Sequence, residues 1–324
     1  MYYAVYEAAV DYQIGKKRIH AGVMLITNKD TEYRLQMGDI CFSLRFEDPG
    51  YCSFAREHYQ EFLSENDPDI NVTIKIALHQ EAIKIPGSFL MSKTVENNNF
   101  SFHSDLINGS VDLDKKQCSI NVKNELLSGK RIRYFEQFLC QVYYTLLKHN
   151  QRNIINNFVI HGCAIRRNGA GYLFTGRSGS GKSTIAKLSS DFDVLNDELV
   201  ILKKVKGSYT LCSTPFQGDF KGNSAISVPL NAVFLIKHGK RNNIKQISKA
   251  EFVTRFIKEV IYSQSLLSTK NEDVLLEMMD FCADVAVNVP FYEMKFLPDK
   301  SFWDVIDGLN GLNNKMEVEH VVVK

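Results

Sequence analysis

The sequence lacks the closely spaced cysteine pairs that mark zinc sites and disulfide frameworks. Its seven cysteines are scattered along 324 residues, their number is odd, and no C-x-x-C pair occurs. Structural zinc sites and disulfide scaffolds both need thiols that can pair at suitable spacing. The cysteine pattern therefore argues against both kinds of site and predicts reduced thiols.

A long apolar run and an excess of charge of one sign are also missing. No segment approaches the ~18 consecutive apolar residues of a membrane-spanning helix. The 39 basic and 37 acidic residues leave a formal charge of +2, whereas surfaces for nucleic acids or anionic membranes are strongly basic. The start, M-Y-Y-A-V-Y-E, lacks the basic-then-apolar order of a signal peptide. We expect a cytoplasmic protein with no nucleic-acid partner and no membrane partner.

The remaining composition is that of a globular protein, with 44% hydrophobic and 23% charged residues. A chain of this length suits two domains. A wide apolar stripe predicts a helix over 130–149, and we place the boundary just before it. The predicted domains are residues 1–126 and 127–324. Whether the chain forms a homo-oligomer is left open by these patterns.

Residues 1–126 are predicted to form an antiparallel α+β recognition domain. Short apolar runs are separated by turn signals such as Asp48-Pro49-Gly50, and helical spacing covers 55–63. The polar segment 91–99 is expected to be a mobile loop. The predicted strands cover 23–27, 40–46, 70–78, 100–103, 110–113 and 118–122. No residue pattern in this domain points to chemistry.

The second domain contains a phosphate-binding loop of the Walker A type. A strand-like run over 172–175 leads into G-R-S-G-S-G-K-S-T and then into a helical segment, which is the strand–GxxxxGK[ST]–helix pattern of P-loops. The glycines let backbone N–H groups approach phosphates closely, and a lysine at this position reaches the outer phosphates. The predicted ATP-binding residues are Gly176, Arg177, Ser178, Gly179, Ser180, Gly181, Lys182, Ser183 and Thr184.

An acidic pair follows the next apolar strand. Asp197 and Glu198 end the run over 192–195, where nucleotide-binding sheets place carboxylates for Mg²⁺ or for the attacking group. The hydroxyl of Ser183 is expected to join the Mg²⁺ shell. A capping box at Ser248 predicts a helix over 249–266. Arg255 is interpreted as a solvated arginine of that helix.

The run F-V-I-H-G-C-A-I-R-R-N-G-A-G-Y-L-F-T-G-R-S-G-S-G-K-S-T, followed by V-L-N-D-E-L-V-I-L, resembles the catalytic domain of HPr kinase/phosphorylase. It is also similar to the related core of ATP-dependent phosphoenolpyruvate carboxykinase. Within this superfamily, the later T-P-F-x-G-D and V-P-F-Y-E-M-K-F segments resemble HPr-kinase-like proteins associated with peptide modification. The resemblance covers about residues 130–310. It implies an α/β catalytic domain with a mixed sheet, and hence an α+β chain.

The resemblance also implies roles for individual residues. Lys182 and the loop would hold the phosphates of ATP, and Asp197 would orient and deprotonate a serine hydroxyl. His161 would position that carboxylate, while Ser183 and Glu198 would hold Mg²⁺. The chain departs from HPr kinases in carrying Asp-Glu where they carry two aspartates. It also has no match to their C-terminal loop, so the resemblance does not extend to the reverse phosphorylase reaction.

The predicted function is that of a serine kinase, an ATP- and Mg²⁺-dependent phosphotransferase acting on a protein or peptide, such as a ribosomal peptide precursor. Two alternatives stay open at this point. One is a kinase of a free small metabolite such as an amino acid. The other is a non-catalytic ATP-binding regulatory protein, for which the intact acidic pair has no obvious use.

Overall fold

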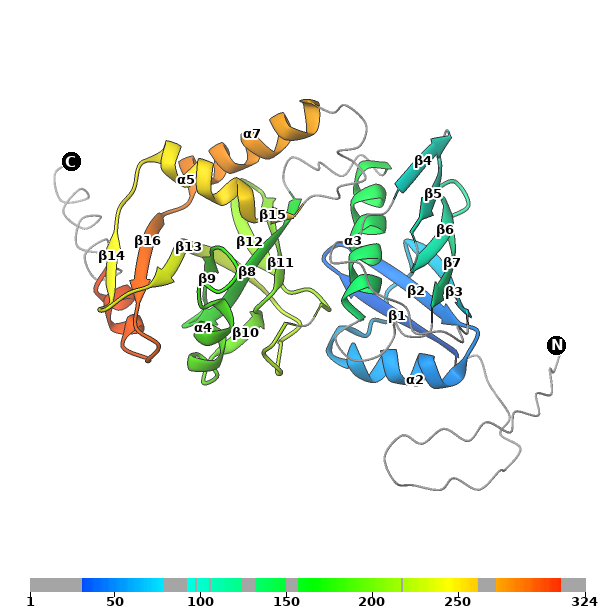
Figure 1. Cartoon of the computed structure of the whole chain (residues 1–324), viewed down its shortest axis with the longest axis horizontal. Helices are drawn as coiled ribbons and strands as arrows, with labels where there is room; N and C mark the ends of the chain where they lie inside the picture. Colours follow the sequence, from blue (N-terminus) through cyan, green and yellow to red (C-terminus); the bar gives the residue numbers. More distant parts are fainter. Residues whose placement is uncertain are drawn as a thin grey trace, which may run out of the picture.

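The computed structural model describes residues 31–77, 92–96, 98–104, 106–123, 132–149, 157–216, 218–261 and 272–309. Within these ranges the chain forms two mixed β-sheets, one from each half of the sequence (Figure 1). Helices and strands are both abundant, and they do not alternate regularly. The chain is therefore of the α+β class, as the sequence predicts.

The first sheet has seven strands in the described part of the chain, in the order β1-β2-β3-β7-β6-β5-β4. One face is apolar, as β7 illustrates with buried Cys118, Ile120 and Val122 between more exposed residues. Apolar residues of the helices α2 (Pro49–His58) and α3 (Ile132–His149) complete this core. The strands are β1 (Glu32–Met37), β2 (Ile40–Phe46), β3 (Ile70–Ala77), β4 (Ser92–Glu96), β5 (Asn99–His103), β6 (Ile107–Asp112) and β7 (Gln117–Lys123).

The prediction that this sheet is antiparallel is wrong for two neighbouring pairs, because β3 runs parallel to both β2 and β7. The cause lies at Asp48 and Pro49, which the sequence analysis interprets as a turn. Asp48 is instead the N-cap of α2, and its Oδ1 accepts a hydrogen bond of 3.0 Å from Tyr51 N. Proline suits the first turn of a helix. The helix starts earlier than expected and carries the chain across the sheet, so that β3 can run parallel to β2.

The segment expected to be a mobile loop contains a strand. Residues 92–96 form β4, which pairs antiparallel with β5 at the edge of the sheet. Edge strands face solvent along one side and tolerate polar and charged sequences. Polarity alone therefore does not distinguish an edge strand from a loop. The strand predicted at 23–27 lies outside the described residues.

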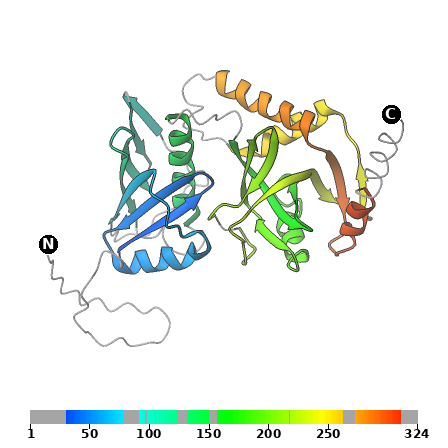
Figure 2. The same ribbon diagram turned by 180° about the vertical axis from the view of Figure 1, so that it is seen from behind.

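Helix α3 packs on the first sheet, although the sequence analysis assigns it to the second domain. The ring of Phe138 meets Phe102 of β5 edge-on at a centroid distance of 5.7 Å. The same helix also holds the second sheet, because the Tyr144 hydroxyl accepts a hydrogen bond from Val159 N and donates one to Ile261 O. Figures 1 and 2 show α3 between the two halves from opposite sides. Helical periodicity predicts that a face is buried but not which sheet receives it.

The second sheet has nine strands in the described part of the chain, along the path β10-β8-β11-β12-β13-β16-β14, with β9 beside β8 and β13 and with β15 beside β8. It is mixed, as the sequence predicts, because β13 pairs parallel with β9 and β16 and the other pairs are antiparallel. The strands are β8 (Asn157–Arg167), β9 (Ala170–Thr175), β10 (Asp193–Asn196), β11 (Leu199–Val205), β12 (Ser208–Cys212), β13 (Ser227–His238), β14 (Asn243–Lys245), β15 (Val260–Ile261) and β16 (Phe291–Phe296).

Helices cover both faces of this sheet. Phe252 and Phe256 of α5 (Lys249–Phe256) and Phe281 of α7 (Glu272–Asn288) belong to the core on one face. On the other face α4 (Lys182–Leu188) and the helix over 302–309 contribute Ile185 and Trp303. Figure 1 shows the two layers on opposite sides of the strands. No helix among the described residues is both long and apolar enough to cross a membrane.

The helix predicted over 249–266 is shorter than expected. Ser248 caps it as predicted, its side chain accepting a hydrogen bond from Glu251 N, but α5 ends at Phe256. A 3₁₀ turn, η5 (Ile257–Glu259), and the two-residue strand β15 follow. Val260 and Ile261 are β-branched residues that suit a strand, and they pair with β8. This early end of α5 places the η5 turn beside the glycine-rich loop over 176–181, on the same cavity.

Candidate active site

The glycine-rich segment forms a loop between the end of β9 and the start of α4, in the order that the sequence predicts. Gly179 and Gly181 have φ values of 77° and 104°, which lie in the left-handed region that glycine adopts without strain. A side chain at Gly181 would approach the ring of Phe296, whose Cε1 lies 2.9 Å from the position of a Cβ atom. The loop therefore needs glycine for both its conformation and its packing.

Lys182 is buried at the inner side of this loop. Its Nζ donates a hydrogen bond of 2.7 Å to Gly176 O. Burial lowers the pKa of the Lys182 ammonium, and the nearby carboxylates of Glu259, Glu198 and Asp197 act in the opposite direction. The ammonium is thus attracted by three carboxylates, two from the turn after β10 and one from η5. Lys182 is the first residue of α4, directly after the glycine-rich loop, which is its place in the predicted strand–loop–helix order.

The other predicted loop residues lie around the same turn. Arg177, Ser178 and Gly179 are exposed, while Ser183 and Thr184 are half-buried in the first turn of α4. The hydroxyl of Ser180 is buried and has no hydrogen-bond partner within the described residues. A cation, an unpartnered hydroxyl and an open glycine backbone together fit a phosphate chain.

The acidic pair lies in the turn between β10 and β11, and Asn196 holds this turn in shape. Asn196 Oδ1 accepts hydrogen bonds from the backbone N–H groups of Glu198 and Leu199, at 2.7 and 3.1 Å. Its amide also donates to Thr214 O at 3.2 Å. The Asn196 side chain thus supplies the hydrogen-bond acceptor that these N–H groups would otherwise need from another part of the backbone. The sequence analysis did not single out Asn196.

The two acids of the pair have opposite surroundings. Asp197 is completely buried, its Oδ2 accepts a hydrogen bond of 3.2 Å from Phe220 N, and its Oδ1 has no partner within the described residues. The side chain of Glu198 is 51% exposed. A buried carboxylate oxygen without a partner is costly. The segment around Phe220 therefore covers the residue that the resemblance names as the base, and Glu198 is the accessible acid.

Replacing Gly218 by alanine should destabilise the second half of the chain by about 2 kcal/mol, a cost typical of overpacking. A Cβ atom there would lie 2.7 Å from Asp197 Cγ, and no φ in the left-handed region is involved. Denaturant unfolding followed by the fluorescence of Trp303, the chain's single tryptophan, measures this loss. In an Asp197→Ala background the same substitution should cost less than about 0.5 kcal/mol. Equal costs in the two backgrounds would contradict the contact.

His161 lies on β8, opposite Leu199 of β11. Its Nδ1 is 3.1 Å from Glu259 Oε2, and its Nε2 is 3.9 Å from Glu198 Oε2. The Thr175 hydroxyl donates a hydrogen bond of 2.7 Å to His161 O and so ties this part of β8 to the strand that leads into the loop. The imidazole is thus held between two acids beside the phosphate loop.

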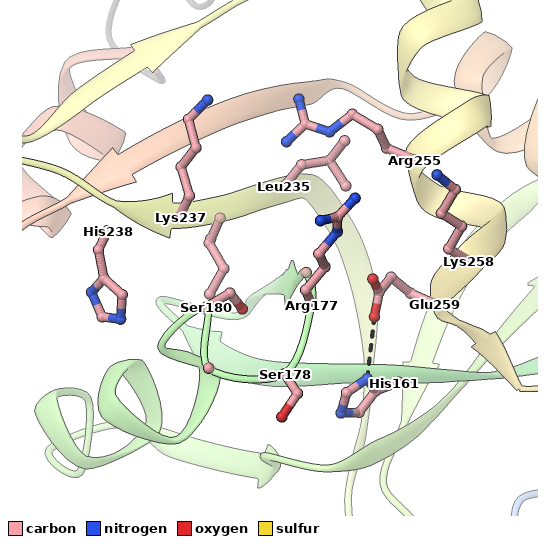
Figure 3. A pocket seen from close by; sticks show the side chains of 13 residues that line it. His161, Arg177, Ser178, Ser180, Leu235, Lys237, His238, Arg255, Lys258 and Glu259 are labelled. Carbon is pink, nitrogen blue, oxygen red and sulfur yellow. Dashed lines mark hydrogen bonds and ion pairs between the residues drawn. The ribbon is translucent and has the colours of Figure 1, made fainter.

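Glu259 is a site residue that the sequence analysis missed. It belongs to η5 and is buried, yet it reaches the cavity and pairs with His161 (Figure 3). The predicted helix over 249–266 placed it on an ordinary helical turn. The β-branched pair Val260-Ile261 after it is the signal that could have indicated an earlier end of the helix.

A cavity of about 750 Å³ opens beside these residues, within the range of small-molecule sites. One wall is the loop segment Gly176–Ser180, and the far wall comes from β13 and the α5–η5 corner. Figure 3 shows the imidazole of His161 and the carboxylate of Glu259 at one end of this space. The complete lining is His161, Gly176, Arg177, Ser178, Gly179, Ser180, Leu235, Ile236, Lys237, His238, Arg255, Lys258 and Glu259.

Several basic side chains border the cavity, and Glu293 of β16 holds two of them. Its Oε2 lies 2.9 Å from Lys237 Nζ and 2.7 Å from an Arg255 amino group. Burial favours a raised pKa for the Glu293 carboxyl, but hydrogen bonds from Lys237 and Arg255 outweigh it and hold the pKa below its ordinary value. Arg255 is therefore not the freely solvated arginine that the sequence analysis expects. The basic border suits an anionic ligand.

Metal binding by protein side chains alone is not indicated in the described part of the chain. No group of three or more His, Cys, Asp or Glu side chains there is placed to hold a metal ion. Mg²⁺ in phosphoryl-transfer sites is commonly held by one or two protein ligands together with phosphates and water. Ser183 at the start of α4 and the half-exposed Glu198 are of the ligand types that such a shared site uses.

Comparison with protein families identifies a relationship over much of the chain. A family model described as "SynChlorMet cassette protein ScmC" matches residues 121–310. This span is more than half of the chain and includes α3, the phosphate loop, the acidic pair and Glu259. No curated protein matches the chain.

Proposed function

We propose that this chain, which belongs to the family of SynChlorMet cassette protein ScmC, is an ATP- and Mg²⁺-dependent kinase that phosphorylates a serine hydroxyl of a protein or peptide. The family's description names a gene cassette and no reaction, so the proposal is based on the site. The observation that carries it is the buried Lys182 beneath a glycine loop, with carboxylates near its ammonium and with His161 beside two of these acids. Phosphoryl transfer uses a cation, acids and a group that orients the acceptor, whereas a protein that only binds a nucleotide has less need of the acids.

The residues of the chain would divide the work as follows. The loop Gly176–Ser180 would accept the phosphate chain through its backbone, and Lys182 would exchange its bond to Gly176 O for the outer phosphates. Glu198 and Ser183 would hold Mg²⁺. Bound ATP would supply the phosphoryl group, and Mg²⁺ would neutralise charge on its phosphates. Since the transition state is loose, orientation of the acceptor hydroxyl matters more than the strength of the base.

The cysteine thiols support a proposal about the location of the protein. All seven cysteines are buried and free, and burial raises the pKa of Cys118, Cys140 and Cys282. Such thiols carry little thiolate at neutral pH. We propose a cytoplasmic location, where free thiols are the rule.

Phosphoryl transfer can be tested with γ-labelled ATP and Mg²⁺, offering a library of serine-containing peptides in one reaction and free L-serine in another. Label on peptide serine is the expected result. The peptides and free serine present the same hydroxyl group, so a difference between them reports which kind of acceptor is recognised. Label on free serine alone would therefore favour the metabolite kinase. Binding of Mg·ATP without any labelled acceptor would favour a non-catalytic nucleotide-binding protein and overturn the proposal. Chelation of Mg²⁺ by EDTA should abolish transfer in either kinase.

A further inference from the structure

The turn η5, which follows α5, holds the Glu259 carboxylate against His161, because the strand after this turn pairs with β8. Val260 and Ile261 of β15 pair with Ile160 and Val159 of β8. This antiparallel register places the preceding residue, Glu259, across from the residue that follows Ile160. Further along, the Tyr144 hydroxyl links β8 to β15. It accepts a hydrogen bond of 2.7 Å from Val159 N and donates one of 2.6 Å to Ile261 O.

The contact between the two side chains fixes which ring nitrogen carries a proton. Glu259 Oε2 lies 3.1 Å from His161 Nδ1. An ionised carboxylate only accepts hydrogen bonds, so Nδ1 is the donor in this pair. In the neutral imidazole Nε2 then carries a lone pair. Its nearest described acid, Glu198, is 3.9 Å away, which is too far for a hydrogen bond.

His161 Nε2 is thus a better placed proton acceptor than the carboxylate of Asp197. His161 lines the cavity and its side chain is 23% exposed. Asp197 is fully buried, is covered by the segment around Phe220, and is absent from the cavity lining. A general base must be within reach of the proton that it accepts. Of the two groups, only the imidazole borders the cavity in which an acceptor could bind.

We propose that Glu259 is a positioning residue for phosphoryl transfer, holding His161 as the Nδ1–H tautomer so that Nε2 accepts the proton of the acceptor hydroxyl. This inference rests on the proposed kinase function. The hydroxyl proton passes to Nε2, and the oxygen forms its bond to the γ-phosphorus. The bond between that phosphorus and the bridging oxygen breaks, and ADP leaves with the electron pair. The imidazolium then lies between Glu259 and Glu198 and returns its proton to water.

Glu259→Gln tests this role with little change in volume. The glutamine amide can donate to Nδ1, which shifts the proton of His161 to Nε2 and removes the acceptor. Transfer should fall about 10- to 100-fold, the size of loss known for residues that orient metal-bound imidazoles, while the dissociation constant for Mg·ATP changes less than about twofold. Glu251→Gln, on the exposed first turn of the preceding helix α5, is the matched control and should retain wild-type transfer. Glu259→Asp keeps the carboxylate and should restore part of the activity.

A spectroscopic measurement separates positioning from a merely structural role. The ¹⁵N shifts of the eight histidines report their tautomers, and His161→Gln identifies the resonances of His161. The wild type should show a protonated Nδ1 and a bare Nε2, and Glu259→Gln should shift this balance. A wild-type Nε2–H tautomer would overturn the inference even if Glu259→Gln failed to fold. Equal transfer by the wild type and a folded Glu259→Gln would also overturn it and leave the kinase assignment intact. A wild type that binds Mg·ATP and labels no acceptor would refute the proposed function itself.

Discussion

Replacing Lys182 by alanine should reduce phosphoryl transfer about 10³-fold, the largest effect on activity that we expect for a single residue. An ammonium about 3 Å from a phosphate charge interacts with it by about 5 kcal/mol at an effective dielectric of about 20. Measured losses for single stabilising groups in active sites reach about 10³-fold. The labelling assay proposed above would measure the loss of transfer, and a titration with Mg·ATP would measure any loss of nucleotide binding.

The matched control for this variant is Lys187→Ala. Lys187 belongs to the same helix, α4, but is exposed in its last turn, so its removal should leave transfer within about twofold of the wild type. Thermal unfolding would show that both variants fold. If a folded Lys182→Ala protein transferred phosphate as well as Lys187→Ala, the loop would not be the phosphate site.

Gly181→Ala should produce the largest loss of stability, about 3 kcal/mol. The backbone there has a φ of 104°, which costs a residue with a side chain about 1–2 kcal/mol. The added Cβ would also meet the ring of Phe296 and would lie 3.1 Å from His238 Cε1. Overpacking of this kind adds about 1–3 kcal/mol. The fluorescence of Trp303, which belongs to the same core as Phe296, reports unfolding at this place.

Gly179→Ala separates the two causes. Gly179 also has a left-handed backbone, with a φ of 77°, but a Cβ atom there would have no neighbour within 4 Å. Only the conformational cost remains, so we expect a loss of about 1 kcal/mol. Losses that differ by less than about 0.5 kcal/mol between the two variants would refute the role assigned to the Phe296 contact. Nucleotide binding should weaken more in Gly181→Ala, because the displaced ring borders the loop.

The elements around the phosphate loop were predictable because their signals are local. A strand, a glycine-rich turn and a helix follow one another without interruption, and each is set by residues that are neighbours in sequence. The Asn196-Asp197-Glu198 turn after an apolar strand is equally local. The contrast is Asp48-Pro49, where the same residue types fit a turn and a helix N-terminus. The choice there depends on the rest of α2, which follows Pro49.

Burial was less predictable than secondary structure. The sequence analysis treats Asp197 and Glu198 as one acidic pair, yet one is completely buried and the other is half exposed. The difference comes from the segment around Phe220, more than twenty residues further along the chain, whose backbone N–H binds Asp197. Both acids lie in the same turn between β10 and β11. Which of the two is covered depends on a distant segment.

The sequence by itself determined that a glycine-lined turn with Lys182 joins a strand to a helix, because backbone conformation at glycine and the order strand–loop–helix are set by neighbouring residues. Only the tertiary structure decided that Glu259 faces His161. Those residues lie 98 positions apart, and they meet because the two β-branched residues that follow η5 pair with β8. Strand pairing joins segments through backbone hydrogen bonds that carry no sequence signature. The partners of the imidazole therefore follow from the fold and not from any motif.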